Sequence, residues 1–307
     1  MFRARAGSIL GHPHPVKVGS VKIAHQRMTA EGASPERWIL FLHGVLGRRT
    51  NWSGFARRIV RARPTWGALL ADLRLHGDSD AGTPPHTVLS AAEDLRVLDD
   101  AVPGAIRAVL GHSLGGKIAL HYANDVHPDL DIVWDVDALP GPTTRDEARA
   151  SIETVFGALE RMPRAYETRD GFLERAAAEG LSAPISAWLA MNLVRDDAGL
   201  HFPLDLAAIR ALVESHFVDD VWRGVESPRT NALIHLVAGG KSPVFQGEDL
   251  GRARRAAERP NIALSVIEDA GHWVHVDAPD ALEALVLADI DAVGPHASDQ
   301  GQPGGSP

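Results

Sequence analysis

The chain has 307 residues, with 31 Lys plus Arg and 40 Asp plus Glu, so its formal net charge is −9. Apolar residues make up 45% of the chain and charged residues 23%, which excludes a largely disordered or collagen-like protein. The acidic balance argues against a nucleic-acid partner, and the absence of cysteine excludes disulfides, thiolate zinc sites and a cysteine nucleophile.

The two ends of the chain lack the patterns of a targeting or spanning segment. No apolar run approaches the roughly 18 residues that cross a bilayer, so we expect no membrane span. Residues 1–10 contain Arg3 and Arg5 but no apolar stretch, which argues against a secretory signal. We therefore expect a cytoplasmic protein that is a monomer or a small homo-oligomer. Residues 294–307 are rich in Gly, Pro and Ser and are predicted to be a disordered tail.

The predicted elements follow one another in a regular order. Residues 1–30 are irregular, with a possible edge strand at Val16–Ala24. Buried strands are then predicted where short apolar runs lack polar alternation, a pattern typical of strands covered on both faces. These runs are Trp38–Leu42, Trp66–Asp72, Ile106–Leu110, Ile132–Val136, Leu233–Val237 and Ile262–Ile267. Helical patterns occupy Ser90–Val102, Ser113 to about Ala123, and Ala278–Val293.

This alternation predicts an α/β fold with a doubly wound, mostly parallel sheet. Residues 31–139 and 226–293 would form the core domain. Between them, residues 140–225 have a mostly helical pattern and are too long for an ordinary connection. We predict that they form a helical cap, inserted after the sixth strand and lying over the edge of the sheet where such folds bind ligands.

The strongest chemical signal is the pentapeptide at residues 111–115, Gly-His-Ser-Leu-Gly. It matches the nucleophile elbow G-x-S-x-G, in which a serine stands on a sharp turn between a strand and a helix. Here the motif follows the strand predicted at Ile106–Leu110 and opens a predicted helix, as that geometry requires. The helix N-terminus then stabilises negative charge at the site. Ser113 is therefore the candidate nucleophile.

A serine nucleophile needs two backbone N–H donors for the oxyanion. One should come from Leu114, the residue after the nucleophile, and the other from Val45, in the loop after the first buried strand. His43, which opens that loop, could be a metal ligand, but we expect it to order the loop by hydrogen bonds. Arg74 and Asp78 are expected to pair with each other and to brace the same loop.

The general base should be a histidine late in the chain, because this architecture orders the triad as Ser, acid, His. His272 follows the last predicted strand and precedes the last helix. His275 lies three residues further on, and an H-x-x-H pair could be part of a metal site. No third ligand accompanies it, so we expect no metal and interpret His275 as a residue at the surface or behind the site.

Four segments together carry a family resemblance. The segments at residues 43–47 (HGVLG), 72–79 (DLRLHGDS), 111–117 (GHSLGGK) and 271–275 (GHWVH) resemble the α/β-hydrolase superfamily, over roughly residues 38–292. The finer match is to the YbfF-type bacterial esterases and related abhydrolase-domain proteins. It rests on the Gly-Gly-Lys after the nucleophile, on residues 137–140 (DALP) and on residues 239–243 (GGKSP).

The triad acid departs from the commoner pattern of this superfamily. Many members place an Asp in a G-x-x-D turn after the penultimate strand, where this chain has Ser242. A hydroxyl cannot offset the charge of an imidazolium as a carboxylate does. Asp137 lies just beyond the strand Ile132–Val136, in the segment where the resemblance to YbfF-type esterases places the acid. We therefore expect Asp137 to be the acid and Ser242 to be an auxiliary that bonds His272. Asp135 is interpreted as a buried structural carboxylate.

The predicted function is hydrolysis of carboxylic esters, and of acyl thioesters as a further possibility, through an acyl-enzyme on Ser113. Apolar residues in the cap suggest a small-molecule substrate with an acyl or other apolar group. No cofactor is expected. Two alternatives remain: C–C bond hydrolysis or perhydrolysis on the same triad, and a non-catalytic ligand receptor on this fold.

Overall fold

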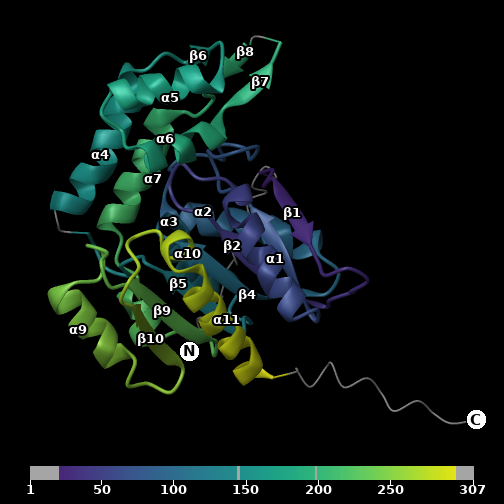
Figure 1. The fold of residues 1–307 in the computed structure, drawn as a ribbon. Helices are drawn as coiled ribbons and strands as arrows, with labels where there is room; N and C mark the ends of the chain where they lie inside the picture. Colours follow the sequence, from purple (N-terminus) through teal and green to yellow (C-terminus); the bar gives the residue numbers. More distant parts are fainter. Residues whose placement is uncertain (1–20, 144–145, 198, 295–307) are drawn as a thin grey trace, which may run out of the picture.

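The computed structural model describes residues 21–143, 146–197 and 199–294. It confirms the predicted fold class, a mostly parallel central sheet flanked by helices (Figure 1). The sheet has seven strands in the order β1-β3-β2-β4-β5-β9-β10. Only β1 is antiparallel to its neighbour. The strands are β1 (His25–Met28), β2 (Arg37–Leu42), β3 (Trp66–Ala71), β4 (Ala105–His112), β5 (Ile132–Val136), β9 (Leu233–Gly239) and β10 (Ile262–Ile267).

The uninterrupted apolar runs reflect burial on both faces of this sheet. In β2, Leu40 and Leu42 pack into one hydrophobic cluster, while Ile39 and Phe41 pack into another on the opposite face. Successive side chains of a strand point to opposite faces, so a strand covered on both sides has no place for polar residues.

Helices cover each face of the sheet. The first face carries α1 (Ser53–Ala62) and α11 (Pro279–Val293), which contact each other. The second carries α2 (Val88–Asp94) and α3 (Leu114–His121). Beside β10 lies α9 (Gly247–Ala256), and the short α10 (Val274–Asp277) precedes α11. The pattern predicted as one helix at Ser90–Val102 is α2 followed by a 3-10 helix at Leu95–Ala101.

The segment between β5 and β9 extends away from the sheet as a separate layer (Figure 1). Its helices are α4 (Asp146–Arg161), α5 (Arg169–Ala178), α6 (Ala183–Leu189), α7 (Leu206–Val218) and α8 (Trp222–Glu226). It also contains a small antiparallel sheet that the helical pattern did not predict, formed by β6 (Ala165–Tyr166), β7 (Val194–Asp196) and β8 (Gly199–His201). These strands have only two or three residues each, too few to show a periodicity in sequence.

Two further details differ from expectation. In the part of the chain that the structure describes, this segment follows β5, the fifth strand in chain order, and not a sixth strand. Only helical structure separates β4 from β5, so no additional strand precedes the insertion there. The predicted edge strand at Val16–Ala24 lies mostly outside the described residues, and the edge strand itself is His25–Met28. The predicted tail, apart from Gly294, also lies outside them.

Candidate active site

Ser113 occupies a strained turn between β4 and α3. Its backbone has φ 55° and ψ −118°, a region that non-glycine residues rarely adopt. Close backbone contacts explain the flanking glycines. A Cβ on Gly111 would lie 2.0 Å from the carbonyl oxygen of Gly115, and one on Gly115 would lie 2.6 Å from that of His43. The turn can therefore form only with glycine at these two positions.

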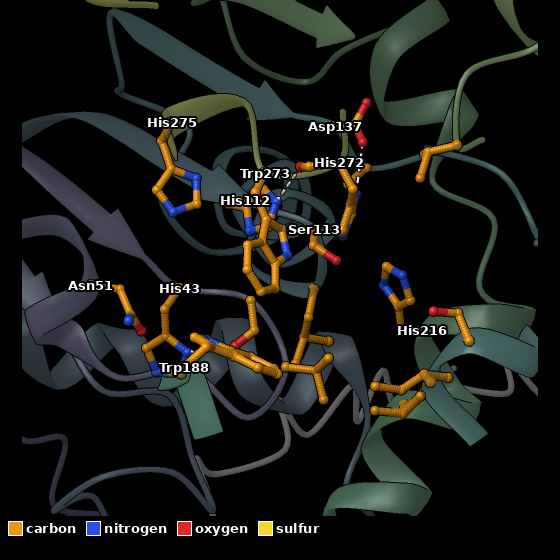
Figure 2. Close-up of a pocket in the computed structure, with 18 of the residues that line it drawn as sticks. His43, Asn51, His112, Ser113, Asp137, Trp188, His216, His272, Trp273 and His275 are labelled. Atoms are coloured by element: carbon orange, nitrogen blue, oxygen red, sulfur yellow. Dashed lines mark hydrogen bonds and ion pairs between the residues drawn. The ribbon is translucent and has the colours of Figure 1, made fainter. Parts of the chain in front are cut away.

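Asp137 and His272 are brought together from distant parts of the chain. Asp137 lies one residue beyond the end of β5 and is fully buried, and His272 follows β10 in the loop before α10. His272 Nδ1 lies 2.7 Å from Asp137 Oδ2 (Figure 2). A ring that donates its Nδ1 hydrogen to the carboxylate leaves the Nε2 lone pair free to accept a proton.

The carboxylate of Asp137 receives two further hydrogen bonds. The backbone N–H of Gly239 donates to Oδ1 over 2.9 Å. The Ser242 hydroxyl donates to Oδ2 over 2.5 Å. The expected auxiliary contact of Ser242 with His272 is therefore not the one observed, because the hydroxyl bonds the carboxylate instead. Ser242 is itself fully buried, so this bond is shielded from solvent.

Ser113 and His272 line the same cavity (Figure 2). Among the described residues, no hydrogen bond joins the Ser113 hydroxyl to His272. Catalytic hydrogen bonds are often long without substrate and shorten only in the reacting complex.

Val45 and Leu114 also line this cavity, and in the described part of the chain neither backbone N–H has a hydrogen-bond partner. The loop that contains Val45 is held in place on both sides. The N–H of the next residue, Leu46, donates to Nε2 of His76 over 2.9 Å. The carbonyl of Leu46 accepts a bond of 2.7 Å from the side chain of Asn192, in the inserted segment.

His43 orders the same loop. Its Nε2 accepts a hydrogen bond from the N–H of Leu73, and its Nδ1 lies 2.7 Å from the carbonyl oxygen of Gly44. Burial lowers the pKa of His43, and burial together with the nearby His43 lowers the pKa of His76 to about 3. Both rings are therefore neutral at pH 7, which lets each accept a backbone hydrogen bond through Nε2.

The predicted pair of Arg74 with Asp78 does not form. Arg74 instead bonds Asp94, at 2.6 Å, and both side chains are buried. Asp78 pairs with Arg48 at 3.0 Å and with Arg49 at 2.8 Å. The sharp turn after β3 sends neighbouring side chains in different directions, so proximity in sequence does not make Arg74 and Asp78 partners.

Aromatic rings pack against one another next to His272. His112 Nε2 lies 2.8 Å from the backbone oxygen of His272, and the two ring centroids are 4.8 Å apart. His275 packs between His112 and Trp52, with centroid distances of 4.9 and 4.6 Å. Burial and the neighbouring His272 lower the pKa of His275 to about 4, so it is neutral at pH 7. His275 is also one of the residues that line the cavity, so it does not lie behind the site as expected.

The cavity has a volume of about 680 Å³ and a mostly apolar lining. Its walls come from both the core and the inserted segment. Trp188 of α6 packs against Trp273, the neighbour of His272, with a centroid distance of 5.6 Å. None of the described residues that line the cavity is Lys or Arg. No group of three or more His, Cys, Asp or Glu that could hold a metal occurs among the residues described.

For two residues near the site, Lys117 and His216, no role was predicted from the sequence. Lys117 is fully buried and donates hydrogen bonds to three backbone carbonyls at the ends of the inserted segment, those of Gly141, His216 and Asp219. His216, of α7, lines the cavity. For Lys117, the one signal in the sequence is a lysine two residues after the nucleophile motif, among the apolar and glycine residues of the first turns of α3.

Comparison with known proteins fits this architecture. A family model described as "Alpha/beta hydrolase family" matches residues 39–285. The chain belongs to the α/β-hydrolase family. The prediction that this chain is a member of the superfamily is therefore confirmed. The finer resemblance of this α/β-hydrolase to YbfF-type esterases stays a prediction.

Relatives of this α/β-hydrolase differ in the activity for which they are named. It is 29% identical to the sn-1-specific diacylglycerol lipase of Mus musculus, over 80% of this chain and 79% of the relative. It is 33% identical to the 2-succinyl-6-hydroxy-2,4-cyclohexadiene-1-carboxylate synthase of Serratia proteamaculans, over 84% and 94%. Among solved structures, a marine microorganism esterase superimposes with a TM-score of 0.74 at 22% identity, covering 88% of this chain and 99% of that one. That likeness shows the shared fold.

Within the described ranges of this α/β-hydrolase, no helix is both long enough and apolar enough to cross a membrane.

Proposed function

We propose that this protein hydrolyses carboxylic esters of small molecules through an acyl-enzyme on Ser113. The observation that carries the proposal is the 2.7 Å contact between His272 and the buried Asp137, in a cavity that Ser113 shares. In this mechanism Ser113 attacks the ester carbonyl while His272 Nε2 accepts its proton. His272 then gives that proton to the leaving alcohol. Water, activated by the same ring, releases the acid.

The remaining groups stabilise charge during these steps. Asp137 orients His272 and stabilises the imidazolium that forms. The N–H groups of Val45 and Leu114 bind the oxyanion, supported by the positive end of α3. Acyl thioesters present the same carbonyl carbon to Ser113 and belong to the proposed substrate range.

The lining of the cavity supports an uncharged, largely apolar substrate. A carboxylate bound there would need a cationic partner, because burying an unpaired charge is costly. No described lining residue is Lys or Arg. This favours neutral acyl esters, as in the name of the lipase relative, over carboxylate-bearing compounds such as the one in the name of the synthase relative.

The proposal is tested with p-nitrophenyl esters of increasing acyl length and with a fluorophosphonate probe. The Ser113→Ala variant should lose at least about 1000-fold in kcat and should not be labelled. Ser265→Ala is the matched control, because Ser265 bonds a histidine, His235, over 2.9 Å but does not line the cavity. It should keep wild-type activity and labelling. No turnover above the Ser113→Ala variant and no labelling of wild type would refute ester hydrolysis and favour a ligand receptor.

A further inference from the structure

The wall of the cavity that the inserted segment contributes contains one imidazole. His216, near the end of α7, lines the cavity, and Figure 2 shows its ring on the side of Ser113 and His272. Its neighbours on this wall are mostly apolar, including Val155, Val213 and Phe217. A polar ring on an apolar wall is a point where a substrate can be recognised by hydrogen bonding.

The His216 ring has unused hydrogen-bonding capacity. Among the described residues neither ring nitrogen has a hydrogen-bond partner, and of the two only Nδ1 is buried, which leaves Nε2 accessible to a ligand in the cavity. His43 differs in this respect, because both of its ring nitrogens bond other groups of the protein, and His272 bonds Asp137 through Nδ1. His275 also has an unpartnered Nδ1, but its ring is held between Trp52 and His112. Buried polar atoms without a partner are uncommon in folded proteins and often mark functional positions.

Lys117 holds His216 in this position. Its ammonium group donates a hydrogen bond of 2.7 Å to the backbone carbonyl of His216. Its other two bonds, of 2.9 and 3.0 Å, go to the carbonyls of Gly141 and Asp219. Three donors therefore meet three acceptors, which fixes the end of α7 against the helix that follows the nucleophile.

The surroundings also keep the His216 ring uncharged. Burial, then the positive charges of Lys117 and of protonated His272, lower the pKa of His216 well below its ordinary value. A neutral imidazole offers one N–H donor and one lone pair. It is therefore suited to an uncharged hydroxyl or carbonyl group and gives no ionic attraction to a carboxylate.

We propose that His216 is a specificity-determining residue that hydrogen-bonds a second, uncharged polar group of the substrate, a hydroxyl or carbonyl separate from the ester that Ser113 attacks. This inference rests on the proposed ester hydrolysis. The substrate class is then acyl esters with an additional hydroxyl or carbonyl, either in the alcohol part, as in a partial ester of a polyol, or in the acyl part.

Matched ester pairs test this directly. For the alcohol part, 2-hydroxyethyl octanoate is compared with propyl octanoate, in which a methyl group replaces the hydroxyl. For the acyl part, methyl 3-hydroxyoctanoate is compared with methyl 3-methyloctanoate. Wild type should favour the hydroxyl member of one pair in kcat/KM by about 3- to 10-fold, the range expected for one hydrogen bond. The pair that shows the preference identifies the part of the substrate that His216 contacts.

Substitutions then assign the preference to the ring. His216→Leu should bring the ratio to about 1, with the loss confined to the hydroxyl ester. His216→Gln retains a donor and an acceptor and should keep part of the preference. The control is His201→Leu, since the Nδ1 of His201 in β8 is also buried without a hydrogen bond, 3.7 Å from Asp196 Oδ1, but His201 does not line the cavity. It should leave the ratio at the wild-type value. Thermal unfolding of each variant shows that the comparison is between folded proteins.

The outcomes separate the two proposals. Hydrolysis of all four esters with equal rates in each pair would overturn the role of His216 and leave ester hydrolysis intact. The same holds if His216→Leu keeps the wild-type ratio, or if His201→Leu changes the ratio as much as His216→Leu does. Failure of wild type to hydrolyse any ester, together with no fluorophosphonate labelling, would overturn ester hydrolysis and this inference with it.

Discussion

Ser242 donates its hydroxyl hydrogen to Oδ2 of Asp137 over 2.5 Å, and both side chains are fully buried. The turn after β9 thus contributes a hydrogen-bond donor to a carboxylate that comes from the end of β5. Parallel strands β5 and β9 are neighbours in the sheet, so their following loops meet at the same edge. The carboxylate and the turn that supports it are therefore adjacent although 105 residues separate them.

Replacement of Asp137 should affect catalysis far more than replacement of Ser242. Asp137→Asn keeps the shape but removes the charge that stabilises the imidazolium, and kcat should fall by about 1000- to 10000-fold. Ser242→Ala removes one of the hydrogen bonds to the carboxylate, and kcat should fall by about 10-fold. Steady-state kinetics with one p-nitrophenyl ester measure both. An Asp137→Asn enzyme with near wild-type kcat would rule out Asp137 as the acid.

Lys117 should determine how the inserted segment is attached to the core. Lys117→Met is similar in length but leaves three buried carbonyls without donors. We expect a loss of about 2–4 kcal/mol in the free energy of unfolding and a rise in KM, because the wall that contains His216 moves. Urea unfolding and steady-state kinetics measure these quantities. Lys22→Met, at an exposed lysine, is the control and should change neither. Equal behaviour of the two variants would show that the three bonds contribute nothing measurable.

Because of the titration of His275, the free energy of unfolding should decrease in acid. The pKa of His275 is about 4 in the folded protein and about 6.5 when unfolded. Between these values the unfolded chain binds a proton that the folded protein does not, so the free energy of unfolding falls as pH decreases. The slope is about 1.4 kcal/mol per pH unit for this one group, with no effect above pH 6.5 or so.

The His275→Phe variant retains a ring between Trp52 and His112 but does not titrate. Its free energy of unfolding should therefore decrease less steeply than that of wild type from about pH 6.5 to 4. The two slopes should differ by about 1.4 kcal/mol per pH unit. Urea unfolding at half-unit intervals of pH measures the two curves, which should be parallel from pH 7 to 8. Curves that stay parallel down to pH 4.5 would contradict the assignment.

His76 should act on the rate through the loop that contains Val45. Replacement by Phe removes the acceptor for the N–H of Leu46, so the loop can move and the oxyanion donor is less well placed. We expect kcat to fall by about 10-fold with little change in KM, since loss of one donor altogether costs about 100- to 1000-fold. His76→Gln can supply an acceptor at the same place and should recover most of the rate. Equal losses in the two variants would show that packing, and not this bond, is what matters.

The fold was predictable from local patterns. Apolar runs without alternation predicted the parallel strands because a strand covered on both faces has to be apolar at every position, and that requirement is visible in a few consecutive residues. The elbow at Ser113 was visible for a similar reason, since the close approach of Gly111 and Gly115 demands glycine locally. The small sheet of the inserted segment was missed because its strands are too short to show a period.

The choice of partner between distant side chains was decided only by the tertiary structure. From the sequence, Ser242 was predicted to contact His272, and Arg74 to contact Asp78. In the folded chain, Ser242 bonds Asp137 and Arg74 bonds Asp94. Sequence patterns report what each position must satisfy locally, such as burial, turn geometry or helix spacing. They do not report which strand ends and which ends of the inserted segment meet at one edge of the sheet. That meeting, between residues as far apart in sequence as Lys117 and His216 (99 positions), places one polar ring on the apolar wall of the cavity.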